Sequence, residues 1–204
     1  MNCWNEIKKW IAFDWKPHAS CIPALVILLL LWPAVQFLPE RCGYENELIE
    51  NFQMFILFFC CFIWTLQKEY RKLFVFAALI FFFMMCREVN FGRALFFPDP
   101  VIPNKFLRWN KIWYAPYVGP GIAIYGMICV IFFFVGKVYK QAFELLTTTR
   151  IPVWHIVSIL ICWAGAAVLD KVCDNLILEE GVELGAYVAI FVTACHYAFM
   201  PSER

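Results

Sequence analysis

Long apolar runs recur along the chain and are separated by short polar connections. Six of them approach the roughly 20 residues that a helix needs to cross the hydrocarbon core of a bilayer. Backbone groups in lipid must pair within their own segment, so these runs predict helices and not isolated strands. The third run reaches this length only by including its polar end. The predicted spans are 21–38, 50–66, 73–90, 117–136, 153–170 and 180–200.

Composition supports the same class. The chain is 63% hydrophobic and only 16% charged, whereas soluble domains carry about 25% charged residues. We therefore predict an all-α polytopic membrane protein whose single integral membrane domain takes up residues 1–204. The formal charge of +1 argues against a nucleic-acid partner, because such binding needs a basic surface. Membrane lipid is the expected partner, and the sequence leaves the oligomeric state open.

The segment before the first span has a weak helical pattern. Trp4, Ile7 and Ile11 recur at helical spacing, with Lys8 and Lys9 on other faces. This pattern predicts a short N-terminal helix lying in the headgroup region. A basic tail without fixed structure is the alternative.

Charges in the connections predict the orientation. If the six spans alternate, the side that holds both termini carries ten Lys and Arg residues and five acids. The other side carries seven Lys and Arg residues and eleven acids. Because cationic connections stay on the cytoplasmic side, we predict a multi-pass protein of the inner (plasma) membrane with both termini in the cytoplasm.

Three acidic stretches, 45–51, 87–93 and 169–184, reach the same outer side in this topology. Each lies at the end of a predicted span, where a polar side chain can point into the bundle without crossing the lipid core. Acids repeat at the i,i+4 spacing in the last stretch, which places them on one helix face. The candidate site residues are Glu47, Glu50, Asn51, Arg87, Glu88, Asn90, Arg93, Asp170, Asp174, Glu179, Glu180 and Glu183.

Ionisable side chains at membrane depth usually face the bundle interior and pair with one another. Arg87 and Arg93 are the expected partners of these acids. Carboxylates gathered in a partly dry site can hold a proton or bind a cation, and Mg²⁺ or Ca²⁺ suits such oxygen ligands. A divalent cation is therefore the candidate cofactor, although no metal site is assigned. The simpler interpretation is a set of wet interfacial acids whose ion pairs fix helix register.

Other motifs add little chemistry. The chain has no C-x-x-C pair, no G-x-S-x-G, no H-E-x-x-H and no glycine-rich phosphate loop. His155 and His196 are expected at similar depth on neighbouring spans. They are either packing residues or a small two-histidine site. Cys42 and Cys173 both map to the outer side, so a disulfide between them is an open alternative.

The connection between the third and fourth spans is the longest in the chain. Prolines at 98, 100, 103, 116 and 120 interrupt regular helix, and its tryptophans and tyrosines suit the headgroup belt. We expect it to lie on the membrane surface as a rim or lid over the outer face. A passive interfacial hairpin is the alternative.

The stretches "ENELIENFQMFILFF", "REVNFGRALF" and "LILEEGVELGA" resemble three blocks of a group of bacterial polytopic membrane proteins with no established activity. In that group an acidic-Ile-Glu entry precedes a helix, a Glu-Glu-Ile-Ser-Trp-Gly-Gln-Arg-like stretch follows a later helix, and a Leu-Glu-Glu-x-x-Glu entry opens a late one. Arg87 stands where the group has its first Glu. The matching positions are Glu47, Glu50, Glu88, Asn90, Gly92, Arg93, Glu179, Glu180 and Glu183.

Three functions follow from these patterns. The first is a membrane protein whose outward-facing acidic and arginine site binds a cation, a proton or a lipid headgroup. The second is a membrane-embedded hydrolase or transferase that acts on a lipid-linked substrate at the outer leaflet, with a Glu as general acid or base. The third is a structural or partner-binding membrane subunit. The central parts of the spans contain few polar residues, which favours a one-sided site over a conducting path.

Overall fold

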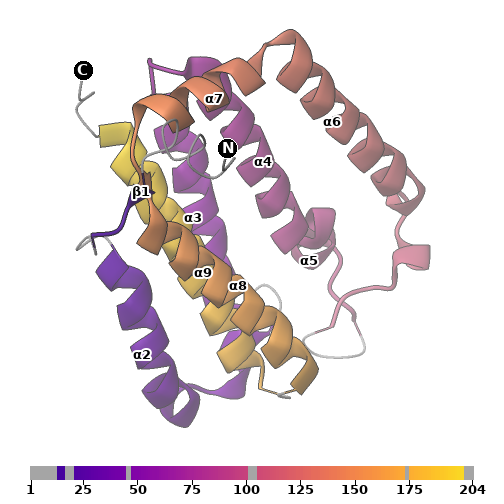
Figure 1. Cartoon of the computed structure of the whole chain (residues 1–204). Coiled ribbons are helices and arrows are strands. Elements are labelled where there is room, and N and C mark those ends of the chain that lie inside the picture. Colours follow the sequence, from indigo (N-terminus) through magenta and orange to yellow (C-terminus); the bar gives the residue numbers. More distant parts are fainter. Residues whose placement is uncertain (1–12, 17–20, 45–46, 101–104, 173–174, 200–204) are drawn as a thin grey trace.

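The computed structural model describes residues 13–16, 21–44, 47–100, 105–172 and 175–199, and this part of the chain is almost entirely helical (Figure 1). Each of the six predicted segments forms a helix, with ends that differ from the prediction by a few residues. The all-α class is therefore confirmed. The long helices are α2 (Ile22–Phe37), α3 (Leu48–Thr65), α4 (Arg71–Glu88), α6 (Ala115–Val135), α8 (Val153–Val172) and α9 (Leu176–Phe199).

The described helices support two or three membrane spans rather than a demonstrated six. By length and composition, α3 and α6 can each cross a membrane. A third span results if α4 and the helical residues Asn90–Phe96 count as one segment across a 53° bend. Helix α2 and the Val153–Leu169 part of α8 are shorter apolar helices. The coarser prediction of a chain with membrane-spanning helices is thus compatible with the structure.

Helix α9 lies at the centre of the packed helices, with α2, α3 and α8 around it (Figure 1). Small residues occupy every fourth position along one of its faces, at Gly181, Gly185 and Ala189. Such a stripe lets neighbouring helix backbones approach closely. A side-chain carbon at Gly181 would collide with the Leu31 side chain of α2. The absence of a side-chain carbon at Gly181 therefore allows α2 to pack closely against α9.

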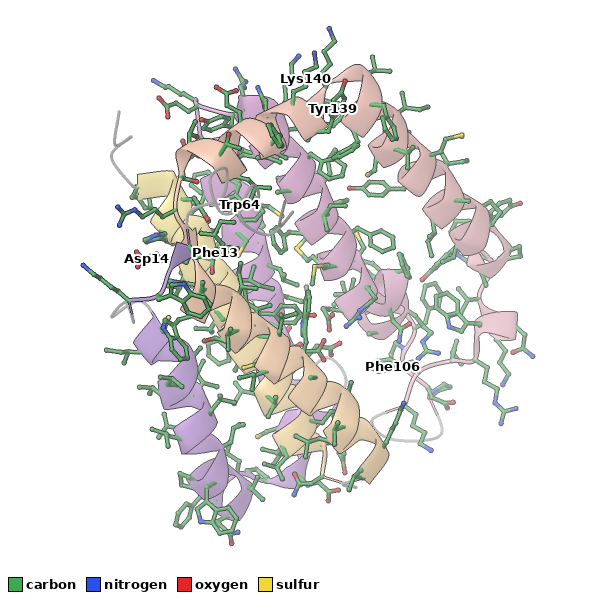
Figure 2. All side chains as sticks on the ribbon, in the orientation of Figure 1. Phe13, Asp14, Trp64, Phe106, Tyr139 and Lys140 are labelled. Carbon is green, nitrogen blue, oxygen red and sulfur yellow. The ribbon has the colours of Figure 1, made fainter. Side chains whose placement is uncertain are left out.

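A buried apolar cluster joins α3, α4 and α9. Leu57 of α3, Phe81 of α4 and Ile190 of α9 belong to it, together with the fully buried Tyr187. Trp64 packs edge-on against Phe81, with ring centroids 4.6 Å apart, and lies among the helices of this core (Figure 2). This cluster holds the three helices together below the polar end that carries the candidate site.

Helices α6 and α7 (Val138–Thr148) form the outer part of the fold. Helix α7 runs across one end of the bundle, and its Gln141 Oε1 accepts a hydrogen bond of 3.0 Å from the Leu73 backbone N–H of α4 (Figure 1). Val138 is buried, whereas Lys140 is exposed and points away from the helices (Figure 2). This segment connects two predicted spans, and its helical structure was not predicted. The predicted N-terminal interfacial helix lies outside the described residues.

Several short elements were not predicted. A two-residue parallel pair joins β1 (Phe13–Asp14) to β2 (Ile151–Pro152). The remaining ones are η2 (Glu40–Gly43), η3 (Asn90–Gly92), α5 (Arg93–Phe96) and η4 (Trp109–Lys111).

The predicted third span is also corrected at its polar end. Helix α4 ends at Glu88 instead of continuing to residue 90. Asn90, Phe91 and Gly92 follow with positive φ values of 51°, 52° and 88°, which are incompatible with a continuing right-handed helix. The chain therefore bends sharply before α5 begins.

The contact between η2 and the start of α9 yields a test of the packing. A side-chain carbon at Gly43 would lie 2.8 Å from the Leu176 backbone carbon and 2.9 Å from the Ile177 backbone nitrogen. Backbone cannot rotate out of the way, so we expect Gly43→Ala to destabilise the protein by about 1–3 kcal/mol in denaturant unfolding in detergent. Gly126→Ala is the control, because nothing lies within 4 Å of the added carbon. Equal stability of both variants would contradict this packing.

Candidate functional site

An ion-paired network joins the end of α4 to the first half of α9. Arg87 Nη2 donates to Glu88 Oε1 at 2.8 Å and to Glu183 Oε1 at 2.9 Å. The Tyr187 hydroxyl lies 2.7 Å from Glu88 Oε1 and 3.0 Å from Glu183 Oε1, in donor geometry to both. A hydroxyl carries a single proton. The tyrosine therefore serves the two carboxylates in turn or shares its proton between them.

A second connection joins α3 to α9. Gln53 is completely buried on α3, and its Nε2 donates to the Glu180 backbone carbonyl at 3.0 Å and to Glu180 Oε2 at 2.9 Å. The Oε1 atom of Gln53 accepts no hydrogen bond from the described residues. Glu50, one helical turn earlier on α3, is buried as well. We call Glu50, Gln53, Arg87, Glu88, Glu180, Glu183 and Tyr187 the acidic cluster.

Burial within the acidic cluster is uneven. The Glu88 side chain is 7% exposed and that of Glu183 is 19% exposed, whereas the Arg87 side chain is 58% exposed. The charges of Glu183, Glu50 and Glu88 act on Glu180 and repel its own. Several negative charges in a site of low polarity are unfavourable unless protons, cations or donors compensate them. The cluster is consequently a place where positive charge is stabilised.

Apolar side chains close the acidic cluster on one side. Tyr187 directs its hydroxyl at the carboxylates while its ring belongs to the buried apolar cluster with Leu57 and Ile190. Thus a polar layer made by α3, α4 and α9 lies directly on an apolar layer made by the same helices. The arrangement is that of a site approached from one end of the bundle.

The structure brings together five of the predicted site residues. Glu50, Arg87, Glu88, Glu180 and Glu183 meet in the acidic cluster, as predicted from three distant stretches.

The guanidinium carbon of Arg93 lies over the Trp109 ring, 5.4 Å from the centroid, and the pairing of Arg93 with these acids stays a prediction. Asn90 supplies a left-handed backbone position. Glu47 and Asn51 lie at the start of α3, where Asn51 Nδ2 donates to the Glu47 carbonyl oxygen at 2.7 Å. Glu179 lies in the first turn of α9. The Asp170 side chain and the whole of Asp174 lie outside what the structure describes.

Two residues of the acidic cluster, Gln53 and Tyr187, were missed by the sequence analysis. Both lie one turn beyond an acid on the same helix, Gln53 three residues after Glu50 and Tyr187 four residues after Glu183. These spacings place each pair on one helix face. The signal was therefore present, but a single Gln or Tyr in an apolar run is common in any helix.

Other chemistry-bearing residues give no metal centre. Among the residues that the structure describes, no group of three or more His, Cys, Asp or Glu side chains is placed to hold a metal ion. His155 and His196 do come together, with ring centroids 5.3 Å apart, and Cys21 Sγ lies 3.9 Å from His155 Nδ1. Cys42 is a free thiol, and its proposed disulfide partner, Cys173, lies outside the described residues.

Comparisons with known proteins do not assign this site. No protein-family model matches the chain, and neither a curated protein nor a solved structure is significantly similar to it.

The Tyr187 hydroxyl yields a direct test of the network. We expect Tyr187→Phe to lower the free energy of unfolding by about 1–2 kcal/mol, because the hydroxyl is the donor to two largely buried carboxylates. Tyr125→Phe is the matched control. It removes a 2.7 Å hydrogen bond to a neutral acceptor, the Leu79 carbonyl oxygen, and costs about 0.5 kcal/mol. A larger loss for Tyr125→Phe than for Tyr187→Phe would rule out this role for Tyr187.

Proposed function

We propose that the chain is a multi-pass inner-membrane protein in which all six long helices cross the bilayer. Both termini would lie in the cytoplasm, and the acidic cluster would lie at the outer side. The cation excess on the terminal side supports this orientation. The apolar character of α3, α6 and the bent pair around α4 supports the membrane location.

We further propose that the acidic cluster binds a cation, and that this cation is a proton. Glu88 and Glu183 both form ion pairs with Arg87, and the charges of Glu183, Glu50 and Glu88 act on Glu180. To neutralise one carboxylate, a proton needs only one carboxyl oxygen that binds it and one acceptor for its hydrogen bond. A metal ion needs several oxygen ligands around one point, and the described residues provide no such group.

The observation that carries this proposal is the amide of Gln53. Its nitrogen donates two hydrogen bonds to Glu180, one to the backbone carbonyl and one to the carboxylate. Its fully buried oxygen accepts no hydrogen bond within the described structure. A buried acceptor without a donor is costly, by about 1–3 kcal/mol. A proton carried by a neighbouring carboxyl group would provide the missing donor to Gln53 Oε1.

A site open at one end fits binding better than conduction. The apolar cluster of Leu57, Phe81 and Ile190 lies directly beneath the carboxylates and contains no chain of polar groups. We therefore propose proton binding that changes the stability of the contacts among α3, α4 and α9, rather than proton passage through the bundle.

The enzymatic alternative is less well supported. It requires Arg87 or Arg93 to hold the phosphate of a lipid-linked substrate. The Arg87 guanidinium is already engaged by two carboxylates, and Arg93 lies over Trp109. A lipid-modifying hydrolase or transferase and a partner-binding subunit both stay predictions from the sequence.

Stability measured against pH tests the proton site. A ligand that binds the folded state stabilises it, and for a proton this means that stability rises as pH falls. We expect the apparent melting temperature of the purified chain in detergent to rise between pH 8 and pH 5 on the order of several degrees. Glu180→Gln, which imitates a protonated carboxyl group, should make this rise smaller.

Controls separate this effect from other causes. Glu47→Gln changes an acid at the start of α3 outside the cluster and should leave the pH dependence as in the unmodified protein. Stabilisation of the unmodified chain by Mg²⁺ or Ca²⁺, abolished by Glu180→Gln, would show that a metal ion occupies the site and that the proton assignment is wrong. The same pH dependence in the unmodified chain and in Glu180→Gln would refute proton binding at Glu180.

A further inference from the structure

An open apolar groove runs between α4 and α6, outside the acidic cluster. Its volume is about 290 Å³, within the order of size of small-ligand pockets. Aromatic and aliphatic side chains make its walls, and the left-handed turn after α4 contributes Phe91. The walls include Phe82, Phe83 and Cys86 from α4, and Tyr117, Gly121 and Ile122 from α6.

Both walls of the groove belong to helices that can cross a membrane. Helix α6 is a candidate span, and almost none of its apolar residues are buried inside the protein. Helix α4 forms the bent candidate span. A groove between two such helices opens to hydrocarbon, where an empty space would cost the dispersion contacts of its lining. An acyl chain of the surrounding lipid is the occupant of matching chemistry.

The polar end of the groove is shaped by the break between α4 and α5. Asn90, Phe91 and Gly92 are all left-handed, and the Phe91 carbonyl accepts a hydrogen bond of 3.0 Å from the Tyr114 hydroxyl. The Phe91 ring packs against Phe83, with centroids 5.8 Å apart. This unusual backbone thus places an aromatic ring and a fixed tyrosine at the mouth of the groove.

Basic residues lie in the connection that leads to that mouth. Arg93 lies over Trp109, and Trp109 packs edge-on against Tyr114, which lines the groove. Arg108 and Lys111 flank Trp109 and are exposed. Residues 93–114 contain four Lys and Arg residues and one acid. We call the exposed side chains of Lys105, Arg108 and Lys111 the basic rim. In Figure 2, Phe106 marks this connection at the opposite end of α6 from Tyr139 and Lys140.

We propose that the groove between α4 and α6 binds one acyl chain of an anionic phospholipid, whose phosphate-bearing headgroup lies against the basic rim. The apolar walls recognise the chain, and the Lys and Arg side chains at the mouth recognise the charge. This inference does not rest on the proposed proton site, because no carboxylate of the acidic cluster lines the groove.

Lipid binding to the full chain can be measured by native mass spectrometry of the detergent-solubilised protein. The probes are phosphatidylglycerol and phosphatidylcholine with identical acyl chains. We expect phosphatidylglycerol to be retained more strongly than phosphatidylcholine. Arg108→Gln combined with Lys111→Gln should reduce that preference by roughly 30-fold, given the contribution of each cation near a lipid surface.

Two glycines of α6 provide a matched pair for the groove itself. A side-chain carbon at Gly121 or at Gly126 would meet no atom within 4 Å, so both positions can accept a larger residue. Gly121 lines the groove, and Gly126 is not among its lining residues. We expect Gly121→Leu to lower retention of both lipids and Gly126→Leu to retain them as the unmodified chain does.

The outcomes separate the parts of the proposal. Equal retention of both lipids by Gly121→Leu and Gly126→Leu, at equal helix content and melting temperature, would overturn the groove as the acyl-chain site. Equal retention of phosphatidylglycerol and phosphatidylcholine by the unmodified chain would overturn recognition of the anionic headgroup. An unchanged lipid profile in Glu180→Gln is expected, and it distinguishes this site from the proton site.

Discussion

Carboxylates on a helix can lie inside a bundle only where neighbouring helices donate hydrogen bonds or positive charge to them. Helix α9 depends on this constraint, because it carries Glu180 and Glu183 at the end where α3 and α4 pack against it. Arg87 from α4 contacts Glu183, and Gln53 from α3 contacts Glu180. The small residues Gly181 and Gly185 of α9 lie against α2 and α8 instead. Polar pairing therefore joins α9 to α3 and α4, and close packing joins it to α2 and α8.

The same arrangement explains why the site is one-sided. Tyr187 places its hydroxyl in the polar layer and its ring in the apolar cluster. Below that ring the three helices are joined mainly by apolar contacts, together with a 3.4 Å hydrogen bond from Cys61 Sγ of α3 to the Ala78 carbonyl oxygen of α4. Helix α4 divides two sites of opposite character, since the acidic cluster lies toward α9 and the groove with its basic rim lies toward α6.

The hydrophobic pattern predicted the positions of the long helices because a span imposes a length and an apolar composition that are visible locally. Charge placement at helix ends also predicted that Glu50, Glu88 and Glu183 share a region. These two predictions use features that each segment carries by itself. The number of membrane spans is a finer statement, and length and composition of the described helices support only two or three.

Features that depend on contacts between segments could not be predicted. Gln53 and Tyr187 become site residues only when α3 and α9 are packed together. The contact of Arg93 with Trp109 depends on the turn that the left-handed residues Asn90 to Gly92 give the chain. Helix α7 was missed because its polar residues resemble those of a connection, although its contacts with α4 hold it against the bundle.

The central claim is that Arg87 of α4 and Glu183 of α9 interact directly and hold the carboxylates of α9 in place. A double-mutant cycle with Arg87→Gln, Glu183→Gln and the combined variant measures this interaction in detergent. We expect a coupling free energy of about 1 kcal/mol, because the ion pair is 2.9 Å long and Glu183 is largely buried. If the combined variant is destabilised by the sum of the two single-variant effects, to within about 0.3 kcal/mol, the two residues do not interact. That result would contradict this account.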